Sequence, residues 1–401
     1  MSLPPDVGTV ASRWVRAPRL RSTESPEEER HATWLELFFD LVFVVAIAEL
    51  AASLRADTSA DGILTFAGLA IPIWWAWVGY SVYANRFDND DVAFRLTMLL
   101  GMLAIAALAV NVPDAFGGDA TGFVVAYLFV RGILILLYDR ARRGVPVARP
   151  LATVFIIGFG AGLGFWVVSL FVSPPVRYVL WGLGIAVEVV TPLIATPLMA
   201  RVPLDARHIL ERFGLFTLLV LGESIVAVAL GTLQVDWQLE ASLTAVAGFV
   251  TVAALWWLYF DFVDGAPVLE RSRRSAMTYV YGHFPITVGL GALGAGVQLA
   301  IIDAQRGHLP AGTRAVLCGG VALYLAAIGL IQFAATESLH DGALAARVAA
   351  ALLLVGLAVA GAWLAPLALA GAMAVVVVAE LAYELVSGQP GAVSATAPDL
   401  A

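Results

Sequence analysis

The chain has 401 residues, of which 60% are apolar and only 13% are charged, whereas about 25% of the residues in ordinary soluble domains are charged. One soluble core could not bury this much apolar surface, so lipid must solvate a large part of the protein. The net charge of -8 and the lack of a basic face argue against nucleic-acid binding. The single cysteine excludes an internal disulfide and a cysteine-cluster metal site.

Residues 1–30 mix arginines with the acidic run Glu27–Glu29 and contain no apolar segment. We therefore expect a disordered cytoplasmic tail and no cleavable signal peptide. Residues 387–401 are small, polar and proline-containing, and we expect them to form a second disordered cytoplasmic tail.

Between the tails, the sequence predicts an all-α polytopic membrane protein with about twelve transmembrane helices. Each apolar segment is long enough to cross a hydrocarbon core of about 30 Å as a helix, and a helix satisfies its own backbone polar groups in lipid. The boundary between the last two, at Trp363 and Pro366, is the least clear, because one long bent helix also fits there. The predicted spans are 34–54, 62–85, 94–112, 120–138, 151–172, 177–199, 213–234, 240–262, 277–302, 314–335, 343–362 and 364–386.

Arginine supplies all 23 basic residues, and its distribution predicts the orientation. With the N-terminus in the cytoplasm, eighteen arginines fall on the cytoplasmic side, whereas Arg131 lies within a span. The positive-inside rule therefore favours both termini in the cytoplasm. The arginines left on the outer side are Arg55, Arg177, Arg306 and Arg314.

Two halves of the chain, 31–200 and 201–386, share two features at one offset of about 182–183 residues. In each half an acidic residue stands near the start of an aliphatic helix, and a tryptophan pair follows in the next span. We interpret this as a parallel 6+6 internal repeat, an arrangement common in transport proteins, although a duplication can also be only a trace of folding history. The matched features are Asp40 with Glu223, and Trp74-Trp75 with Trp256-Trp257.

Ionisable residues within a span each cost roughly 2.5–3.5 kcal/mol on insertion scales, so they need an explanation. Glu36 and Asp40 are four residues apart and share one helix face. Asp40 lies about 9 Å along the helix from Trp34, too deep for its short side chain to reach the interface easily. We expect Asp40 and Glu223 to bind a cation or relay protons. The alternative is a structural role as partners of arginines, and the candidates are Arg86, Arg95, Arg131 and Arg212.

Two further ionisable residues are candidates for the same polar pathway. Glu188 lies in the middle of the sixth predicted span, and His283 lies in the ninth, two residues before Pro285. The alternative for both is internal hydrogen bonding, because a lone histidine in a membrane helix is often a satisfied packing residue. Glu49, near the outer end of the first span, can reach water and is a weaker candidate.

Aromatic residues deep within the spans are candidates to line a cavity. Their faces could stack on an organic cation, although packing in the protein core is the alternative. Tyr80 lies near the depth of Asp40, where its hydroxyl could meet the carboxylate. The cavity-lining candidates are Trp74, Trp75, Tyr80, Trp256 and Trp257.

One motif resembles a dinucleotide-binding pattern but lacks its context. Gly289, Gly291 and Gly294 fit GxGxxG, yet they lie inside an apolar helix with no preceding strand. Close helix packing by small residues explains them, as it would explain Gly160 and Gly164. The sequence contains no HExxH, P-loop or GxSxG motif, so we expect no enzymatic activity, no cofactor and no metal site.

Two stretches resemble a known family. Residues 34–44, Trp-Leu-Glu-Leu-Phe-Phe-Asp-Leu-Val-Phe-Val, are similar to the opening signature of the bacterial low temperature requirement protein A family, and Leu221-Gly-Glu-Ser-Ile225, preceded by Glu211-Arg-Phe213, resembles its second signature. The resemblance covers about residues 30–385. It implies a multi-pass protein of the bacterial inner membrane, singles out Glu36, Asp40, Glu223 and Ser224, and supplies no substrate.

The leading hypothesis is a transporter-like protein whose intramembrane carboxylates bind a proton or cation, or couple it to a small-molecule substrate. A cation channel is the first alternative. The endolysosomal potassium channels also pair six-span repeats, but their Phe-Ser-Asp motif differs from Phe38-Phe39-Asp40. A membrane sensor or scaffold linked to low-temperature growth is the second. The expected partner is the lipid bilayer rather than nucleic acid, and the sequence does not indicate the oligomeric state.

Overall fold

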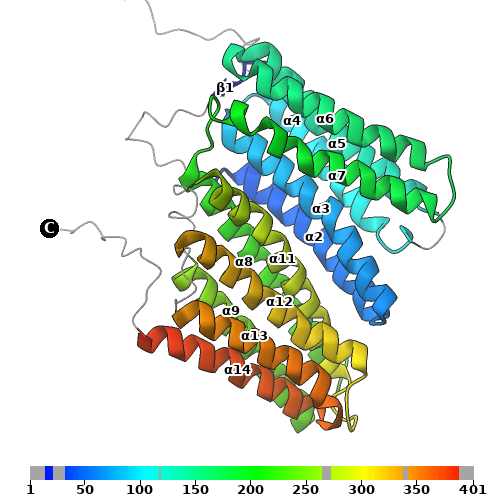
Figure 1. Ribbon diagram of the computed structural model, residues 1–401. Coiled ribbons are helices and arrows are strands. Elements are labelled where there is room, and N and C mark those ends of the chain that lie inside the picture. The colour runs from blue at the N-terminus through cyan, green and yellow to red at the C-terminus, as the bar shows by residue number, and fades with distance from the viewer. Residues whose placement is uncertain (1–13, 21–31, 117–118, 264–271, 337–341, 388–401) are drawn as a thin grey trace, which may run out of the picture. The chain divides into compact units, whose positions relative to one another are not determined.

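The computed structural model describes residues 14–20, 32–116, 119–263, 272–336 and 342–387. These residues are almost entirely helical (Figure 1). The described chain contains twelve helices that are long and apolar enough to cross a membrane, which confirms the predicted all-α class and the number of spans. Most of the two predicted tails, 1–13, 21–31 and 388–401, lies outside the described residues.

The helices follow the predicted spans closely, because long apolar runs in lipid satisfy their backbone only as helices. The first six are α2 (Trp34–Ala56), α3 (Ala60–Arg86), α4 (Val92–Val110), α5 (Thr121–Gly144), α6 (Arg149–Ser169) and α7 (Val176–Met199). The next six are α8 (Ala206–Leu233), α9 (Leu239–Phe262), α11 (Arg273–Ile302), α12 (Ala311–Thr336), α13 (Gly342–Ala360) and α14 (Pro366–Ser387). Short 3-10 turns, η1 (Pro146–Ala148) and η2 (Gly361–Trp363), precede α6 and α14.

The last two predicted spans are separate helices. Helix α13 ends at Ala360, the turn η2 follows, and Leu364 has an extended backbone with ψ of 136°. Pro366 then opens α14, a position where proline needs no backbone donor and its fixed φ suits a helix.

One predicted boundary is wrong by about two turns. Helix α8 begins at Ala206 rather than at residue 213. Asp205 stabilises this start, because its carboxylate accepts the backbone N–H of His208 at 3.2 Å. The added turns are polar, so hydropathy alone does not mark them, and they place His208 and Arg212 on a helix instead of in a loop.

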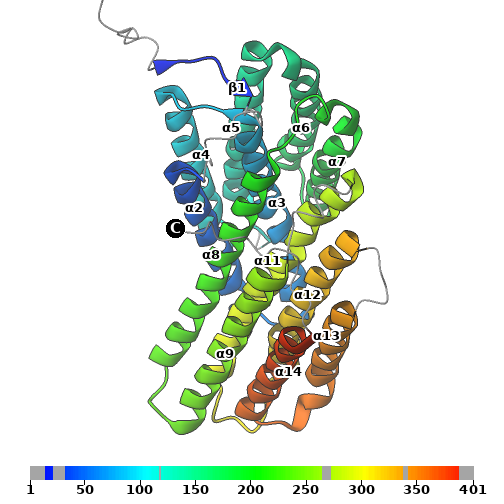
Figure 2. The same cartoon turned by 90° about the vertical axis from the view of Figure 1, so that its left-hand side faces the viewer.

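The chain divides into two compact units. The first comprises Met1–Glu49 and Gly68–Arg212, and the second comprises Leu50–Ala67 and Phe213–Ala401. Within the first unit, α4, α5, α6 and α7 pack against one another in chain order (Figures 1 and 2). Within the second, α12 packs between α11 and α13, and α14 packs against α9 and α13. The 6+6 repeat remains a prediction.

Glycines allow α11 and α12 to approach closely at one crossing. A Cβ added to Gly289 would lie 2.6 Å from the carbonyl oxygen of Gly320, and one added to Gly320 would lie 2.7 Å from that of Gly289. A Cβ on Gly296 would meet the backbone of Leu317 at 2.5 Å. This close packing accounts for the glycine-rich stretch of α11, as the sequence predicts.

The same explanation is wrong for Gly160 and Gly164. A Cβ at either position would meet no described atom within 4 Å. The close contacts of α6 are made instead by Gly158, beside Thr191, and by Gly162, beside Glu188. The two faces of α6 differ by half a turn, and composition alone does not reveal which face touches α7.

A two-stranded ribbon, which the sequence does not predict, joins the N-terminal segment to the loop before α4. Strand β1 (Arg19–Leu20) pairs antiparallel with β2 (Phe87–Asp88). Asp91 holds the N-terminal segment against the start of α4. Its carboxylate accepts the backbone N–H groups of Phe94 and Arg16 at 2.7 and 2.8 Å, and it also forms an ion pair with Arg140. Burial raises the pKa of Asp91, but these interactions outweigh it and leave the pKa below the ordinary value of 3.8.

We expect Gly320→Ala to lower the thermal midpoint of the protein in detergent. The added methyl group would press on the backbone of α11, and overpacking of this kind costs about 1–3 kcal/mol. Gly319→Ala is the matched control, because a Cβ there meets no described atom within 4 Å. Equal midpoints for the two variants would contradict the close crossing.

We expect Asp91→Asn to lower the midpoint above pH 3.8, where the ionised carboxylate makes its full contribution. That contribution is lost as the pH falls through the lowered pKa, since the unfolded chain takes up the proton first. Tryptophan fluorescence melts across this acidic range would show the difference between variant and wild type shrinking to zero. Asp90→Asn, at a neighbouring side chain that is 74% exposed, should change little at any pH. A difference that persisted in acid would refute the assignment.

Candidate functional site

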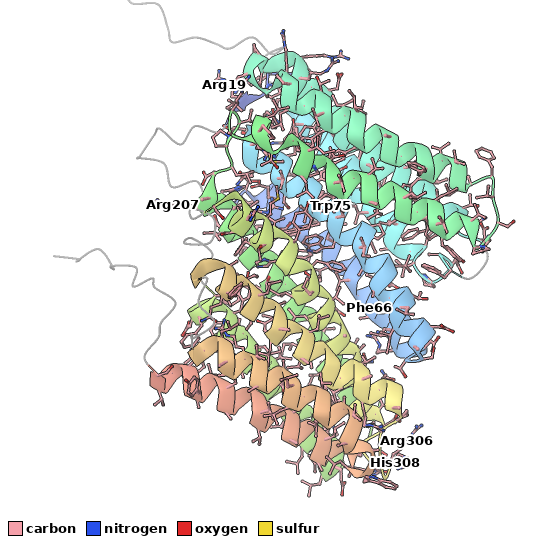
Figure 3. The ribbon with its side chains drawn as sticks, viewed as in Figure 1. Arg19, Phe66, Trp75, Arg207, Arg306 and His308 are labelled. Atoms are coloured by element: carbon pink, nitrogen blue, oxygen red, sulfur yellow. The ribbon has the colours of Figure 1, made fainter. Side chains whose placement is uncertain are left out.

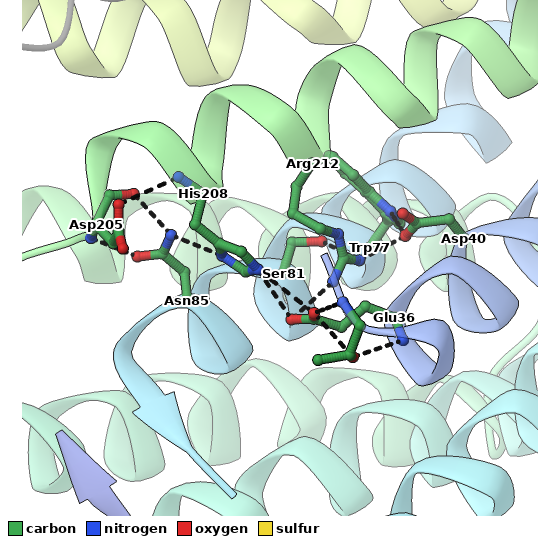
Figure 4. Close-up of polar contacts among 9 residues, drawn as sticks. Glu36, Asp40, Trp77, Ser81, Asn85, Asp205, His208 and Arg212 are labelled. Carbon is green, nitrogen blue, oxygen red and sulfur yellow. Dashed lines mark hydrogen bonds and ion pairs between the residues drawn. The ribbon is translucent and has the colours of Figure 1, made fainter. Parts of the chain in front are cut away.

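A charged cluster lies inside the first unit, where polar residues of α2, α3 and α8 come together, most of them four residues apart along their helix (Figure 4). This spacing puts the residues of each helix on one face. All of them are buried except Asp205, at the start of α8. Helix α2 supplies Glu36 and Asp40, α3 supplies Trp77, Ser81 and Asn85, and the beginning of α8 supplies Asp205, His208 and Arg212.

Asp40 forms the centre of this cluster and is fully buried. Its Oδ1 atom accepts the indole N–H of Trp77 at 2.7 Å and a guanidinium N–H of Arg212 at 2.5 Å. The same nitrogen of Arg212 is 3.3 Å from the hydroxyl of Ser81. The Oδ2 atom of Asp40 has no hydrogen-bond partner among the described residues.

Glu36 joins the cluster to the first turn of α2. One carboxylate oxygen accepts the N–H and the hydroxyl of Thr33, at 2.8 and 3.0 Å, while the Thr33 hydroxyl accepts the N–H of Glu36 at 3.3 Å. This reciprocal arrangement is a capping box. The other oxygen lies 3.2 Å from Arg212. The Nε2 atom of His208 lies close to both oxygens, 3.4 Å from the oxygen that accepts from Thr33 and 3.3 Å from the other.

The hydrogen-bond pattern assigns the tautomer of His208. The side-chain amide of Asn85 lies 3.1 Å from Nδ1 of His208, and the same amide nitrogen donates to the carbonyl of Asp205 at 2.8 Å. The amide oxygen accepts the N–H of Asp205 at 2.9 Å, which fixes the orientation of the amide. Nδ1 is therefore an acceptor, and Nε2 carries the proton that faces Glu36.

The charges in this cluster do not balance. Among its buried members, Glu36 and Asp40 supply two negative charges, Arg212 supplies one positive charge, and His208 is neutral in the tautomer above. One negative charge is left in an interior where burial of an uncompensated charge is costly. A bound proton or monovalent cation would neutralise it. Two carboxylate oxygens of the cluster, Oε1 of Glu36 and Oδ2 of Asp40, have no hydrogen-bond partner among the described residues. Oε1 of Glu36 is already close to Arg212 and His208, which leaves Oδ2 of Asp40 to receive the ion.

Glu188 lies in a separate and neutral pair. It is 2.5 Å from Arg131, and the side chains of both residues are fully buried. Tyr127 donates its hydroxyl to Glu188 at 2.9 Å, and the guanidinium carbon of Arg131 lies 4.5 Å from the ring centre of Phe159. Because the two charges cancel, the geometry supports a structural role for Glu188 as the partner of an arginine.

The aromatic candidates of the first unit pack in its interior. Tyr80 donates to the backbone carbonyl of Val130 at 2.7 Å and so does not use its hydroxyl on Asp40. Trp74 and Trp75 are only 3% and 4% exposed, and their rings are 6.2 Å apart (Trp75 is labelled in Figure 3). The tryptophan that contacts the carboxylate is Trp77, one turn of α3 before Ser81.

His283 is a satisfied core residue of the second unit. Its Nε2 atom is 2.7 Å from the hydroxyl of Tyr259, and its Nδ1 atom is 2.7 Å from the carbonyl of Tyr279, one turn earlier. The imidazole therefore donates to Tyr279 and accepts from Tyr259. The centres of the imidazole ring and the Phe213 ring are 4.8 Å apart. This pattern supports the packing alternative for His283.

The remaining candidates of the second unit differ in burial. Ser224 is buried and donates to the backbone carbonyl of Leu290 at 3.2 Å, which links α8 to α11. Glu223, the residue before it, is half-buried. Trp256 and Trp257 are 44% and 42% exposed, so they do not lie in the core of this unit. The equivalence of Glu223 with Asp40 remains a prediction.

The sequence predicts only a structural role for Arg212 and does not single out Trp77, Ser81, Asn85 or His208. Their signal is the spacing of four along α3 and α8, which repeats the spacing of Glu36 and Asp40. Within the described residues, no group of three histidine, cysteine, aspartate or glutamate side chains is arranged to hold a metal ion.

These features define a multi-pass helical membrane protein with charged side chains buried among its helices. The sequence model of the bacterial low temperature requirement A protein (LtrA) family matches residues 31–382, so the chain belongs to this family. It is also similar to the uncharacterized protein RA0937 of Rhizobium meliloti (strain 1021), with 32% identity over 287 residues, which are 66% of this chain and 68% of that protein.

We expect Arg212→Leu to destabilise the protein strongly, because it leaves Glu36 and Asp40 buried without their cation. Breaking a buried ion pair in this way costs about 3–5 kcal/mol. Unfolding can be followed with a thiol-reactive dye, since Cys318 is the single cysteine and is buried. Arg95→Leu is the control, because Arg95 and its partner Asp90 are 60% and 74% exposed and such pairs contribute about 0–1 kcal/mol. An equal loss in both variants would contradict the role of Arg212.

Proposed function

We propose that this protein is a membrane transporter that binds a proton or a monovalent cation at Asp40 and couples its movement to that of a small-molecule substrate. The observation that carries the proposal is the uncompensated charge of the cluster around Arg212. Oδ2 of Asp40 is buried and has no hydrogen-bond donor among the described residues. A proton or cation bound to this oxygen would supply the missing positive charge. Ionisable residues inside membrane helices commonly mark ion pathways.

Binding at Asp40 would change the partner of Arg212. With Asp40 ionised, the guanidinium is shared between Asp40 at 2.5 Å and Glu36 at 3.2 Å. Neutralising Asp40 leaves Glu36 as the stronger partner. Since Arg212 belongs to α8 and both carboxylates belong to α2, occupancy of Asp40 would shift the first turns of α8 against α2. This provides a physical link between ion binding and helix movement.

We further propose that the protein lies in the bacterial inner membrane with both termini in the cytoplasm. The distribution of arginines supports this orientation, and family membership supports the bacterial context. Transport rather than catalysis is proposed because the sequence carries no recognised catalytic motif. The lipid bilayer is the expected partner, and nucleic acid is not.

Purified protein in proteoliposomes with an entrapped pH-sensitive dye tests the proposal. We expect flux under an imposed proton or sodium gradient, and we expect Asp40→Asn to reduce it about tenfold or more, since tenfold corresponds to only about 1.4 kcal/mol of lost interaction. Glu49→Gln, on the same helix but half-buried and outside the cluster, should retain the flux. Glu223→Gln should match Asp40→Asn if the predicted equivalence holds.

Each other outcome separates the alternatives. Unchanged flux in a folded Asp40→Asn variant would remove this carboxylate from the mechanism. Discrete single-channel currents in planar bilayers would indicate a channel, because the turnover of one transporter molecule is too slow to give a resolvable current. The absence of any flux under both gradients would favour a sensor or scaffold.

A further inference from the structure

A second charged cluster lies in the second unit, on helices α13 and α14. Glu380 and Glu384 are four residues apart on α14 and therefore share one face. Arg347 on α13 faces both of them, and all three residues are at most 4% exposed. None of these residues belongs to the site around Asp40, and the sequence pattern singles out none of them.

Arg347 is engaged almost entirely by Glu384. Its Nε and Nη2 atoms donate to the two carboxylate oxygens of Glu384 at 2.6 and 2.8 Å. This two-point geometry is the strongest form of an arginine–carboxylate pair. It neutralises the charge of Glu384 and leaves only a longer contact, 3.7 Å from Nε, to Glu380.

Glu380 is the member of the cluster that lacks a partner. Neither of its carboxyl oxygens has a hydrogen-bond donor among the described residues, and its side chain is only 2% exposed. An ionised carboxylate in this position would be buried without a hydrogen-bond donor, which is costly. It would also lie beside a second carboxylate, whose negative charge repels it. A proton on Glu380 removes the charge and provides a donor that can reach Glu384.

The other titratable groups around the cluster do not supply this donor. Tyr324 of α12 lies within electrostatic range of Arg347 and Glu380, but its hydroxyl donates to the carbonyl of Leu255 at 2.9 Å. On α9 and α11, which pack against α14, the hydroxyl of Tyr259 and the imidazole of His283 bind each other. The compensating group for Glu380 is therefore not found among these described neighbours.

We propose that Glu380 and Glu384 share one exchangeable proton beside Arg347, so that this cluster is a proton-binding site of the second unit. Two carboxyl groups held together in a low-dielectric interior bind a proton as a pair, because both cannot ionise there at once. Glu384 lies three residues before the end of α14 at Ser387, about 4.5 Å along the helix. The proton therefore has a short path to the end of the helix. The proposal does not depend on transport through Asp40.

Infrared spectroscopy of the purified protein tests this site directly. The measurement is made in an Asp40→Asn background, so that a proton on Asp40 cannot contribute; at neutral pH, where exposed carboxyl groups are ionised, we expect the carbonyl-stretch band of one protonated carboxylic acid per chain. Glu380→Gln should abolish that band. Glu384→Gln should abolish it as well, because Glu380 then becomes the ionised partner of Arg347. Glu240→Gln, at an exposed position in the first turn of α9, should leave it unchanged.

Thermal melts supply a second measurement. Glutamine resembles a protonated glutamate, so Glu380→Gln should fold and should keep its midpoint as the pH is raised, whereas the wild-type midpoint falls once the shared proton is lost. A band that survives Glu380→Gln would place the proton elsewhere, and the absence of the band in the Asp40→Asn background would refute the site. A band that sodium displaces at constant pH would identify a cation site and overturn the proposal.

Discussion

The salt bridge between Arg212 and the two carboxylates of α2 is the interaction on which the interior of the first unit depends. Each of these groups would be costly to bury alone, by several kcal/mol in a medium without water. Trp77 and Arg212 both donate to Asp40, and the hydroxyl of Ser81 lies beside the same guanidinium nitrogen. The helices that carry them are therefore joined by specific contacts as well as by apolar packing, which in lipid provides little preference for one partner over another.

The buried ion pairs between membrane helices of the described residues are of two kinds. Arg131 and Glu188 form a closed pair in which the two charges cancel. Around Arg212, and again around Arg347, two carboxyl groups surround one guanidinium. A pair with equal charges has no net charge to neutralise, whereas two acids with one base leave a position for a proton or a cation. This difference in charge balance, rather than the depth of any one residue, separates structural groups from candidate sites.

The number and approximate bounds of the helices could be predicted from the sequence, because hydropathy and span length measure the physical quantity that decides them. Glu36 and Asp40 could also be selected, since their spacing is visible in the sequence. His208 could not be selected, because the first turns of α8 are polar and their sequence is typical of a loop. Only the structure shows that Asp205 caps a helix there. The sequence does not distinguish Trp77 from Trp74 and Trp75 as the partner of Asp40, since a run of tryptophans does not show which ring faces a carboxylate. The partners of Glu188 and His283 needed three-dimensional neighbours, so their roles stayed open.

The capping box at Thr33 gives Glu36 two tasks. The oxygen that accepts from Thr33 fixes where α2 begins, the other oxygen of the same carboxylate faces Arg212, and His208 lies close to both. The end of the helix and the electrostatics of the interior therefore share one titratable group. A change of charge at Glu36 would loosen the first turn of α2 at the same time as it altered the cluster. The edge of this helix is thus set by an ionisation state and not by the limit of its apolar sequence alone.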